Sequence, residues 1–156
     1  MSLTDPSADI IAQVTDEGRT LIARATLGDV VFKVEGFAVG RGGYDPSNVV
    51  DTLPLDPAAV ELSDKVYPDA TPLSFASFIS TEEPKASVRV YNCRVAASPL
   101  SGNADYGLGE LGLYGTIVHS SDPTEIGQVF LYAVSHFPIM CKTRRDTFLR
   151  RVVVSY

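Results

Sequence analysis

Residues 106–115 constrain the fold more than any other part of this sequence. They read YGLGELGLYG. Four positions are glycine, one is the acid Glu110, and the remaining five are leucine or tyrosine. The segment from Leu113 to Val118 contains tyrosine and three β-branched residues, which favours a strand. Glycine inside a strand allows a bulge or the close approach of another backbone. The stretch therefore predicts a strand against which other segments pack closely.

Gly107, Gly109 and Gly112 also match the G-x-G-x-x-G pattern of dinucleotide-binding loops. In those loops the pattern follows a strand, opens a helix and precedes an acid by about 20 residues. Here a Ser-Gly-Asn-Ala-Asp loop precedes the pattern and a strand-like segment follows it. We therefore expect no nucleotide, and the sequence predicts no other cofactor and no metal.

The length of 156 residues indicates a single domain, and the content of 45% hydrophobic and 21% charged residues is typical of globular proteins. No apolar run of about 18 residues occurs, so we expect no membrane-spanning helix. The first residues lack the basic and apolar regions of a secretory signal. We expect an N-terminal arm of residues 1–14 that packs on its own domain or on a neighbour, followed by one β-rich attachment domain over residues 15–156.

The clearest local pattern is a helix over residues 16–27. Thr15 is a favoured N-cap, and the acids that follow it complement the helix dipole. Gly28 is placed to adopt the left-handed conformation that ends many helices. One helix face carries Gly18, Leu21, Ile22 and Ala25. The helix is short, so it must dock on the rest of the domain to persist.

Strand-like segments, rich in β-branched and aromatic residues, fill much of the remaining chain. They cover residues 29–40, 73–80, 87–97, 106–118, 128–135 and 147–156. Five of the ten prolines lie in residues 51–84, which argues against long central strands there, and Pro138 predicts a turn. Since the strands follow one another without crossover helices, the fold class is α+β and β-rich: an antiparallel sheet or sandwich with one prominent N-terminal helix.

No motif in the sequence points to catalysis. His119 and His136 lie outside any zinc-binding pattern, and no G-x-S-x-G nucleophile motif occurs, so we do not expect an enzyme. Cys93 and Cys141 lie in apolar or β-like surroundings. We predict that both are buried, reduced thiols, with a single disulfide between them as the alternative.

The net charge of −6 is unevenly distributed. Residues 1–83 hold 14 acids and 5 bases, giving −9, and residues 84–156 hold 5 acids and 8 bases, giving +3. The acidic total argues against a nucleic-acid partner. The asymmetry is either incidental or lets copies of the chain meet head to tail. The candidate interface residues are the apolar Ile10, Ile11 and Val14 and the basic Lys142, Arg144, Arg145, Arg150 and Arg151.

Four short segments form a further, ordered pattern. They are VTDEGRTLIARA at residues 14–25, AVGRGG at residues 38–43, VYP at residues 66–68 and ELGLY at residues 110–114, with Phe137-Pro138 following. In this order they resemble the N-terminal, attachment domain of phage tail-collar fibre proteins. The structural motif of that resemblance consists of Glu110, Gly112, Leu113 and Tyr114. Two positions depart from the family pattern: Gly109 replaces a basic residue, and Arg41 replaces an acid.

The resemblance implies a structural protein of the phage tail, assembled in the host cytoplasm. Fibre proteins continue into a shaft and tip, whereas this chain ends at Tyr156, so we expect a baseplate or tail-fibre adaptor. Its partners would be baseplate or tail proteins, a tail fibre and further copies of itself, three-fold association being one option. No membrane partner is expected.

The alternative is a small carbohydrate- or receptor-binding β module, in which loop tyrosines such as Tyr44 and Tyr106 stack on a sugar. For Glu110 itself, a buried acid is costly unless it is paired or hydrogen-bonded. Because leucine and glycine flank it in a strand, we predict that Glu110 is at least partly buried and accepts a hydrogen bond or forms an ion pair; the alternative is an acid that points to solvent.

Overall fold

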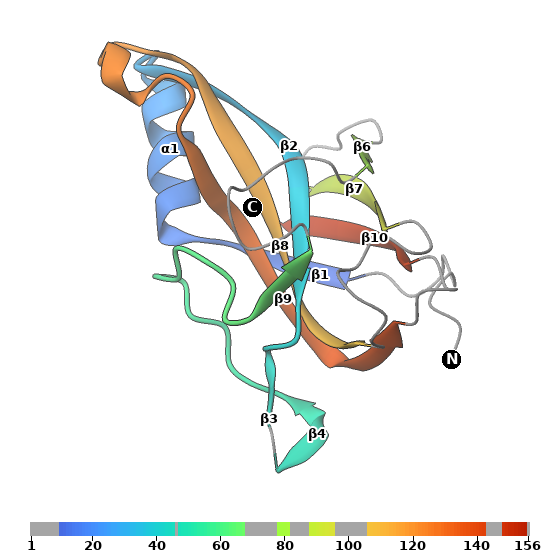
Figure 1. The fold of residues 1–156 in the computed structure, drawn as a ribbon. Coiled ribbons are helices and arrows are strands. Elements are labelled where there is room, and N and C mark those ends of the chain that lie inside the picture. The colour runs from blue at the N-terminus through green and yellow to red at the C-terminus, as the bar shows by residue number, and fades with distance from the viewer. Residues whose placement is uncertain are drawn as a thin grey trace.

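The computed structural model describes residues 10–45, 47–67, 78–81, 88–95, 106–142 and 148–155. The elements in these residues are β1 (Ile10–Val14), α1 (Asp16–Thr26), β2 (Val30–Gly40), β3 (Tyr44–Asp45), β4 (Asn48–Thr52), β5 (Lys65–Tyr67), β6 (Phe78–Thr81), β7 (Val88–Val95), β8 (Tyr106–Ser120), a 3-10 turn (Pro123–Glu125), β9 (Val129–Lys142) and β10 (Phe148–Ser155). The expected β-rich α+β domain with one prominent helix is confirmed (Figure 1).

Eight of the described strands form one sheet in the order β5-β2-β8-β9-β1-β10-β7-β6, and β3 pairs with β4 as a separate hairpin. The sheet curls, so that β6 at one edge lies against β2 near the other. All neighbouring pairs are antiparallel except β1 and β10, which run parallel. The expectation of an antiparallel sheet therefore holds for every pair but this one.

Residues 10–14 of the expected N-terminal arm pack on their own domain, as strand β1. It is inserted between β9 and β10, which are consecutive along the described chain. Ile10, Ala12 and Val14 point into the core, while Ile11 and Gln13 between them point outward. This alternation has the period of two that a half-buried strand requires. Residues 1–9 lie outside the described residues.

Helix α1 begins and ends where the sequence predicts. The Thr15 Oγ1 atom accepts a hydrogen bond of 3.0 Å from the backbone N–H of Gly18, and Gly28 adopts a φ of 80°. The Thr15 hydroxyl also donates to the carbonyl of Leu131 at 2.6 Å, which joins the helix start to β9. A Cβ at Gly18 would lie 2.6 Å from the carbonyl oxygen of Tyr132, so the absence of a side chain lets α1 approach β9.

The sheet buries apolar side chains on both faces. The larger cluster, the inner core, contains Phe37 and Val39 of β2, Leu111 and Leu113 of β8, and Leu21 of α1. A smaller outer cluster contains Ala38, Leu62, Tyr114, Leu131 and Val134, with Leu55 and Ala59 packed against it. Ala38 alternates with Phe37 and Val39 along β2, which assigns the two clusters to opposite faces of the sheet.

Phe137 and Pro138 correct the expectation of a turn at this point. Both lie inside β9, which continues to Lys142. The pairing of β8 with β9 is irregular between Leu108 and Glu110, and Pro138 lies in the matching part of β9. Proline is tolerated in a strand at such an irregularity because no ladder hydrogen bond is required of it there.

Candidate functional site

Glu110 is the central residue of the site that the structure forms from the glycine-rich segments. Only 1% of its surface is exposed, on a long strand in the middle of the sheet. Its Oε1 atom accepts a hydrogen bond of 2.8 Å from the Asp64 amide, and Oε2 accepts one of 3.2 Å from the Ser63 amide. The predicted burial and hydrogen bonding of Glu110 are confirmed, and the donors are backbone groups.

Glycines form the walls around this carboxylate. A Cβ at Gly40 would overlap Oε1, and a Cβ at Gly42 would lie 2.7 Å from Oε2. Either side chain would displace the carboxylate or the backbone around it. We call Glu110, Gly40, Gly42, Ser63 and Asp64 the Glu110 nest. The AVGRGG segment thus supplies two walls of the nest, and the ELGLY segment supplies the acid.

Gly112 and Tyr114 extend the contact along β8. A Cβ at Gly112 would lie 3.1 Å from Leu62 Cδ2, so the missing side chain leaves room for Leu62. The Tyr114 hydroxyl donates to the Glu61 carboxylate. Burial, followed by the contact with Glu61, raises the pKa of Tyr114, which keeps the phenol protonated as a donor. Leu113 instead faces the inner core.

Lys65 completes the contact between β8 and the segment that precedes β5. Its Nζ lies 3.5 Å from Glu61 Oε2 and 5.9 Å from the centre of the Tyr114 ring. Its side chain is 6% exposed. Residues 61–65 are therefore held on β8 by side chains as well as by backbone amides.

Residues 41–64 form a strap that leaves the end of β2 and returns at β5. Its two ends are joined by a hydrogen bond of 2.9 Å from the Arg41 amide to the Asp64 carbonyl and by an Arg41–Asp64 ion pair of 3.1 Å. Its middle is held where His136 Nδ1 donates to the Leu53 carbonyl at 2.8 Å. The Pro57 carbonyl accepts from the Asp16 amide at 2.7 Å. The strap covers the outer cluster, and its β3–β4 hairpin projects from the body of the domain (Figure 1).

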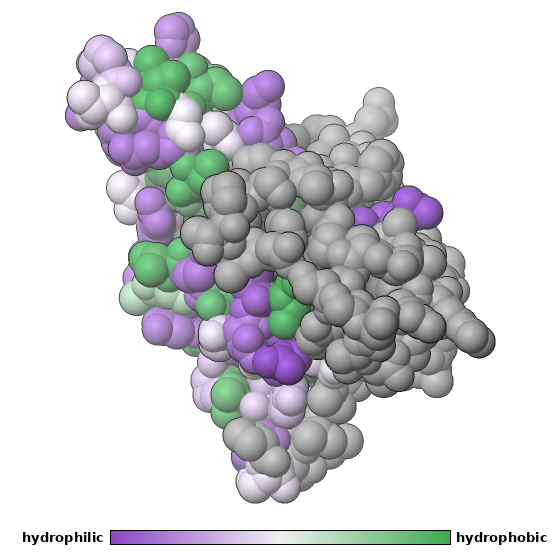
Figure 2. All heavy atoms as spheres, in the orientation of Figure 1, coloured by the Kyte–Doolittle hydropathy of each residue, from purple (hydrophilic) through white to green (hydrophobic). Residues whose placement is uncertain are grey.

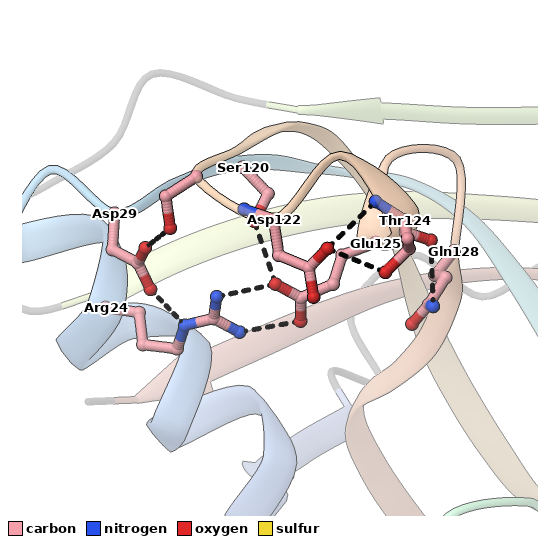
Figure 3. Close-up of polar contacts among 8 residues, drawn as sticks. Arg24, Asp29, Ser120, Asp122, Thr124, Glu125 and Gln128 are labelled. Atoms are coloured by element: carbon pink, nitrogen blue, oxygen red, sulfur yellow. Dashed lines mark hydrogen bonds and ion pairs between the residues drawn. The ribbon is translucent and has the colours of Figure 1, made fainter.

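A second polar cluster joins α1 to the far end of β2, β8 and β9 (Figure 3). Arg24 binds Glu125 through two hydrogen bonds of 2.9 and 2.7 Å, and its Nε lies 2.5 Å from an Asp29 carboxylate oxygen. Arg24 and the Ser120 hydroxyl hold the pKa of Glu125 at about 2. The Ser121 hydroxyl, followed by Arg24, lowers the pKa of Asp29. These contacts join residues 24–29 to residues 120–125, two segments that are distant in sequence.

Exposed apolar side chains lie near this polar cluster. Leu27, at the end of α1, is 83% exposed. The other large hydrophobic residues exposed on these elements are Val31, Val118, Ile126 and Val129. Figure 2 shows hydrophobic surface at this end of the molecule, opposite the β3–β4 hairpin. We call these five residues the apolar end. Exposed apolar patches are typical of interaction surfaces.

The candidate interface residues have mixed outcomes. Ile11 is 63% exposed, and Arg151 is half-buried. Ile10, Val14 and Arg150 are buried, which corrects their selection as surface contacts. All three lie on the inward rows of β1 and β10, as the register of these strands requires. The side chain of Lys142, at the end of β9, and both Arg144 and Arg145 lie outside what the structure describes.

Of the cysteines and tyrosines that the sequence singled out, Cys93 and Tyr44 pack inside the fold. Cys93 is buried and free, and burial raises the pKa of its thiol. The ring of Tyr44 packs on Gly109, where a Cβ would lie 2.6 Å from its Cδ1 atom. The side chains of Cys141 and Tyr106 are not described. The described residues contain no group of three or more His, Cys, Asp or Glu that could hold a metal ion.

Sequence reasoning missed the donors of the nest and the residues of the second polar cluster. Ser63 and Asp64 act through backbone amides, which every non-proline residue carries. Arg24, Asp29 and Glu125 have side chains suited to ion pairs, but no local pattern relates them.

Within the described residues, no helix is long and apolar enough to cross a membrane. Comparisons with known protein families, curated proteins and solved structures found no match to this chain.

Proposed function

We propose that this chain is a structural protein of the phage tail, a baseplate or tail-fibre adaptor that works by binding other proteins. One observation carries the proposal: two of the four segments that resemble tail-collar fibre proteins form the Glu110 nest, and a third lies beside it. Residues 38–43 supply Gly40 and Gly42, and residues 110–114 supply Glu110. Residues 66–67 belong to β5, which directly follows Ser63 and Asp64 and pairs with β2.

The remaining segment and the two departures from the family pattern also have structural roles. In residues 14–25, Thr15 caps α1 and Gly18 allows the helix to approach β9. Arg41, in place of an acid, pairs with Asp64 within the strap. Gly109, in place of a base, leaves room for Tyr44 and for the Gly42 carbonyl. The resembling segments therefore have connected structural roles in this fold, which supports treating them as one pattern.

An adaptor must contact two neighbours at once, and the domain has two separate candidate surfaces. The β3–β4 hairpin lies at one end of the domain and the apolar end lies at the other (Figure 1). Association of several copies, with three-fold symmetry as one option, is part of the proposal. Such symmetric association is common among structural proteins.

Immunogold electron microscopy tests the proposal. Antibodies raised against the purified chain are applied to phage particles from the culture in which the chain is produced, with pre-immune serum as the control. We expect gold label at the tail or baseplate and none on the capsid. If no particle is labelled while the chain stays in the soluble fraction of the lysate, the adaptor proposal is wrong.

A further inference from the structure

The Glu110 nest has the construction of a small-anion site. Ser63 and Asp64 are successive residues, and both of their N–H groups point at the same carboxylate, at 3.2 and 2.8 Å. Successive backbone N–H groups that converge in this way form the anion-binding concavities known in many proteins. The backbone of Gly40 and Gly42 closes around the two carboxylate oxygens without room for a side chain. Such a site is shaped for a flat group with two oxygen atoms.

We propose that the Ser63 and Asp64 amides, with Gly40 and Gly42, form a carboxylate-binding site whose resident ligand is the Glu110 side chain. Free acetate binds there when this side chain is removed. The inference concerns the chemistry of the nest and does not depend on the proposed tail function. It assigns the AVGRGG segment a role in enclosing the site and the ELGLY segment a role in supplying its ligand, Glu110, while the donors come from Ser63 and Asp64.

The donors determine which ligands fit. Both protein groups are N–H donors, so the ligand must present an acceptor to each of them. A carboxylate does so with both oxygens, and its charge strengthens both hydrogen bonds. A primary amide would turn an NH2 group toward one of the N–H donors, and chloride is a single spherical acceptor without the two oxygen atoms of a carboxylate. Acetate and formate should therefore bind, and acetamide should not.

Glu110→Ala creates a space of suitable size for the test. The heavy atoms that this substitution removes, a methylene and a carboxylate, correspond to those of one acetate ion. Bound acetate would restore both hydrogen bonds. A ligand that binds only the folded state stabilises that state in proportion to the logarithm of its concentration above Kd.

The experiment measures the Tm of Glu110→Ala during a sodium acetate titration, with sodium chloride keeping the ionic strength constant. In chloride, we expect Glu110→Ala to have a lower Tm than the wild type. At acetate concentrations above the Kd, its Tm should rise and recover most of this loss. Acetamide should give no such rise. Two controls should respond equally to acetate and chloride. In the wild type, the Glu110 side chain already occupies the nest. Glu17→Ala removes an exposed acid in the first turn of α1 and leaves the nest intact.

Hydrogen exchange gives a local readout in the same samples. Acetate should slow exchange of the Ser63 and Asp64 amides in Glu110→Ala. If Glu110→Ala does not fold in chloride, refolding from denaturant in acetate should restore a cooperative melt. The proposal is overturned if acetate stabilises the variant no more than chloride or acetamide does, if the two amides gain no protection, or if acetate fails to restore folding.

Discussion

Replacing Glu110 with glutamine tests whether the nest stabilises the domain through the carboxylate itself. Glutamine has nearly the same volume, so the substitution leaves the packing around Gly40 and Gly42 unchanged. It removes one hydrogen bond to a charged acceptor, and it turns an NH2 group toward the Ser63 or Asp64 amide. The lost bond and the unpaired buried donor together should lower the free energy of unfolding by about 2–4 kcal/mol. For a domain of this size that corresponds to a Tm lower by roughly 5–15 °C.

Urea denaturation followed by circular dichroism provides the measurement, and Glu17→Gln provides the matched control. The control replaces an exposed acid by the same amide and should stay within about 0.5 kcal/mol of the wild type. An equal dependence of the unfolding free energy on urea concentration would indicate that the folded state keeps its compactness. If Glu110→Gln is as stable as Glu17→Gln, the two amide hydrogen bonds do not stabilise the fold, and the reasoning is refuted.

Three further predictions concern the nest, the second polar cluster and β1. Gly42→Ala should lower the free energy of unfolding by about 1–3 kcal/mol, because the added Cβ overlaps the Glu110 carboxylate. The loss should be smaller when Glu110 is already alanine, and equal losses in the two backgrounds would contradict the prediction. Because the pKa of Glu125 falls from 4.5 to about 2 on folding, its contribution is present above pH 4.5 and is lost as the pH falls toward 2. Arg24→Gln should make the Tm fall less steeply between pH 4.5 and pH 2 than it does in the wild type. If the two curves of Tm against pH are parallel, Arg24 does not cause this pH dependence. Deleting residues 1–14 removes a central strand and should abolish the cooperative melt, whereas a full-strength transition would show that β1 is dispensable.

The sequence predicted the elements whose signals are local. Thr15 and Gly28 mark the ends of α1 through their own chemistry. The strand over residues 147–156 was also predicted, and alternation along it buries Val152 and Val154 together with Arg150, one of the candidate interface residues. Glu110 could be predicted to be buried because leucine and glycine flank it. These predictions depend on neighbours along the chain, which a sequence displays directly.

The features that escaped prediction depend on contacts between distant residues. The apolar residues at positions 10–14 predicted only an arm, and nothing local indicates that it forms a strand inserted between β9 and β10. Pro138 suggests a turn. Only the pairing of β9 with β8 reveals an irregularity at which a strand tolerates proline. The strap has little regular structure, and its partners on β8 lie about fifty residues away. Its position follows from the nest, whose donors leave no trace in residue type.

The Glu110 carboxylate can fix the position of the strap, which an apolar side chain at position 110 could not do. An apolar residue could help to cover the outer cluster, but it would accept many positions of the strap. Hydrogen bonds are directional, and the two from Ser63 and Asp64 fit one arrangement only. A buried charge without them would be strongly destabilising, so any displaced position of the strap is disfavoured. We infer that Glu110 fixes where the strap lies. The β3–β4 hairpin that the strap carries is thereby held in one orientation before any partner binds, which reduces the entropy lost on binding.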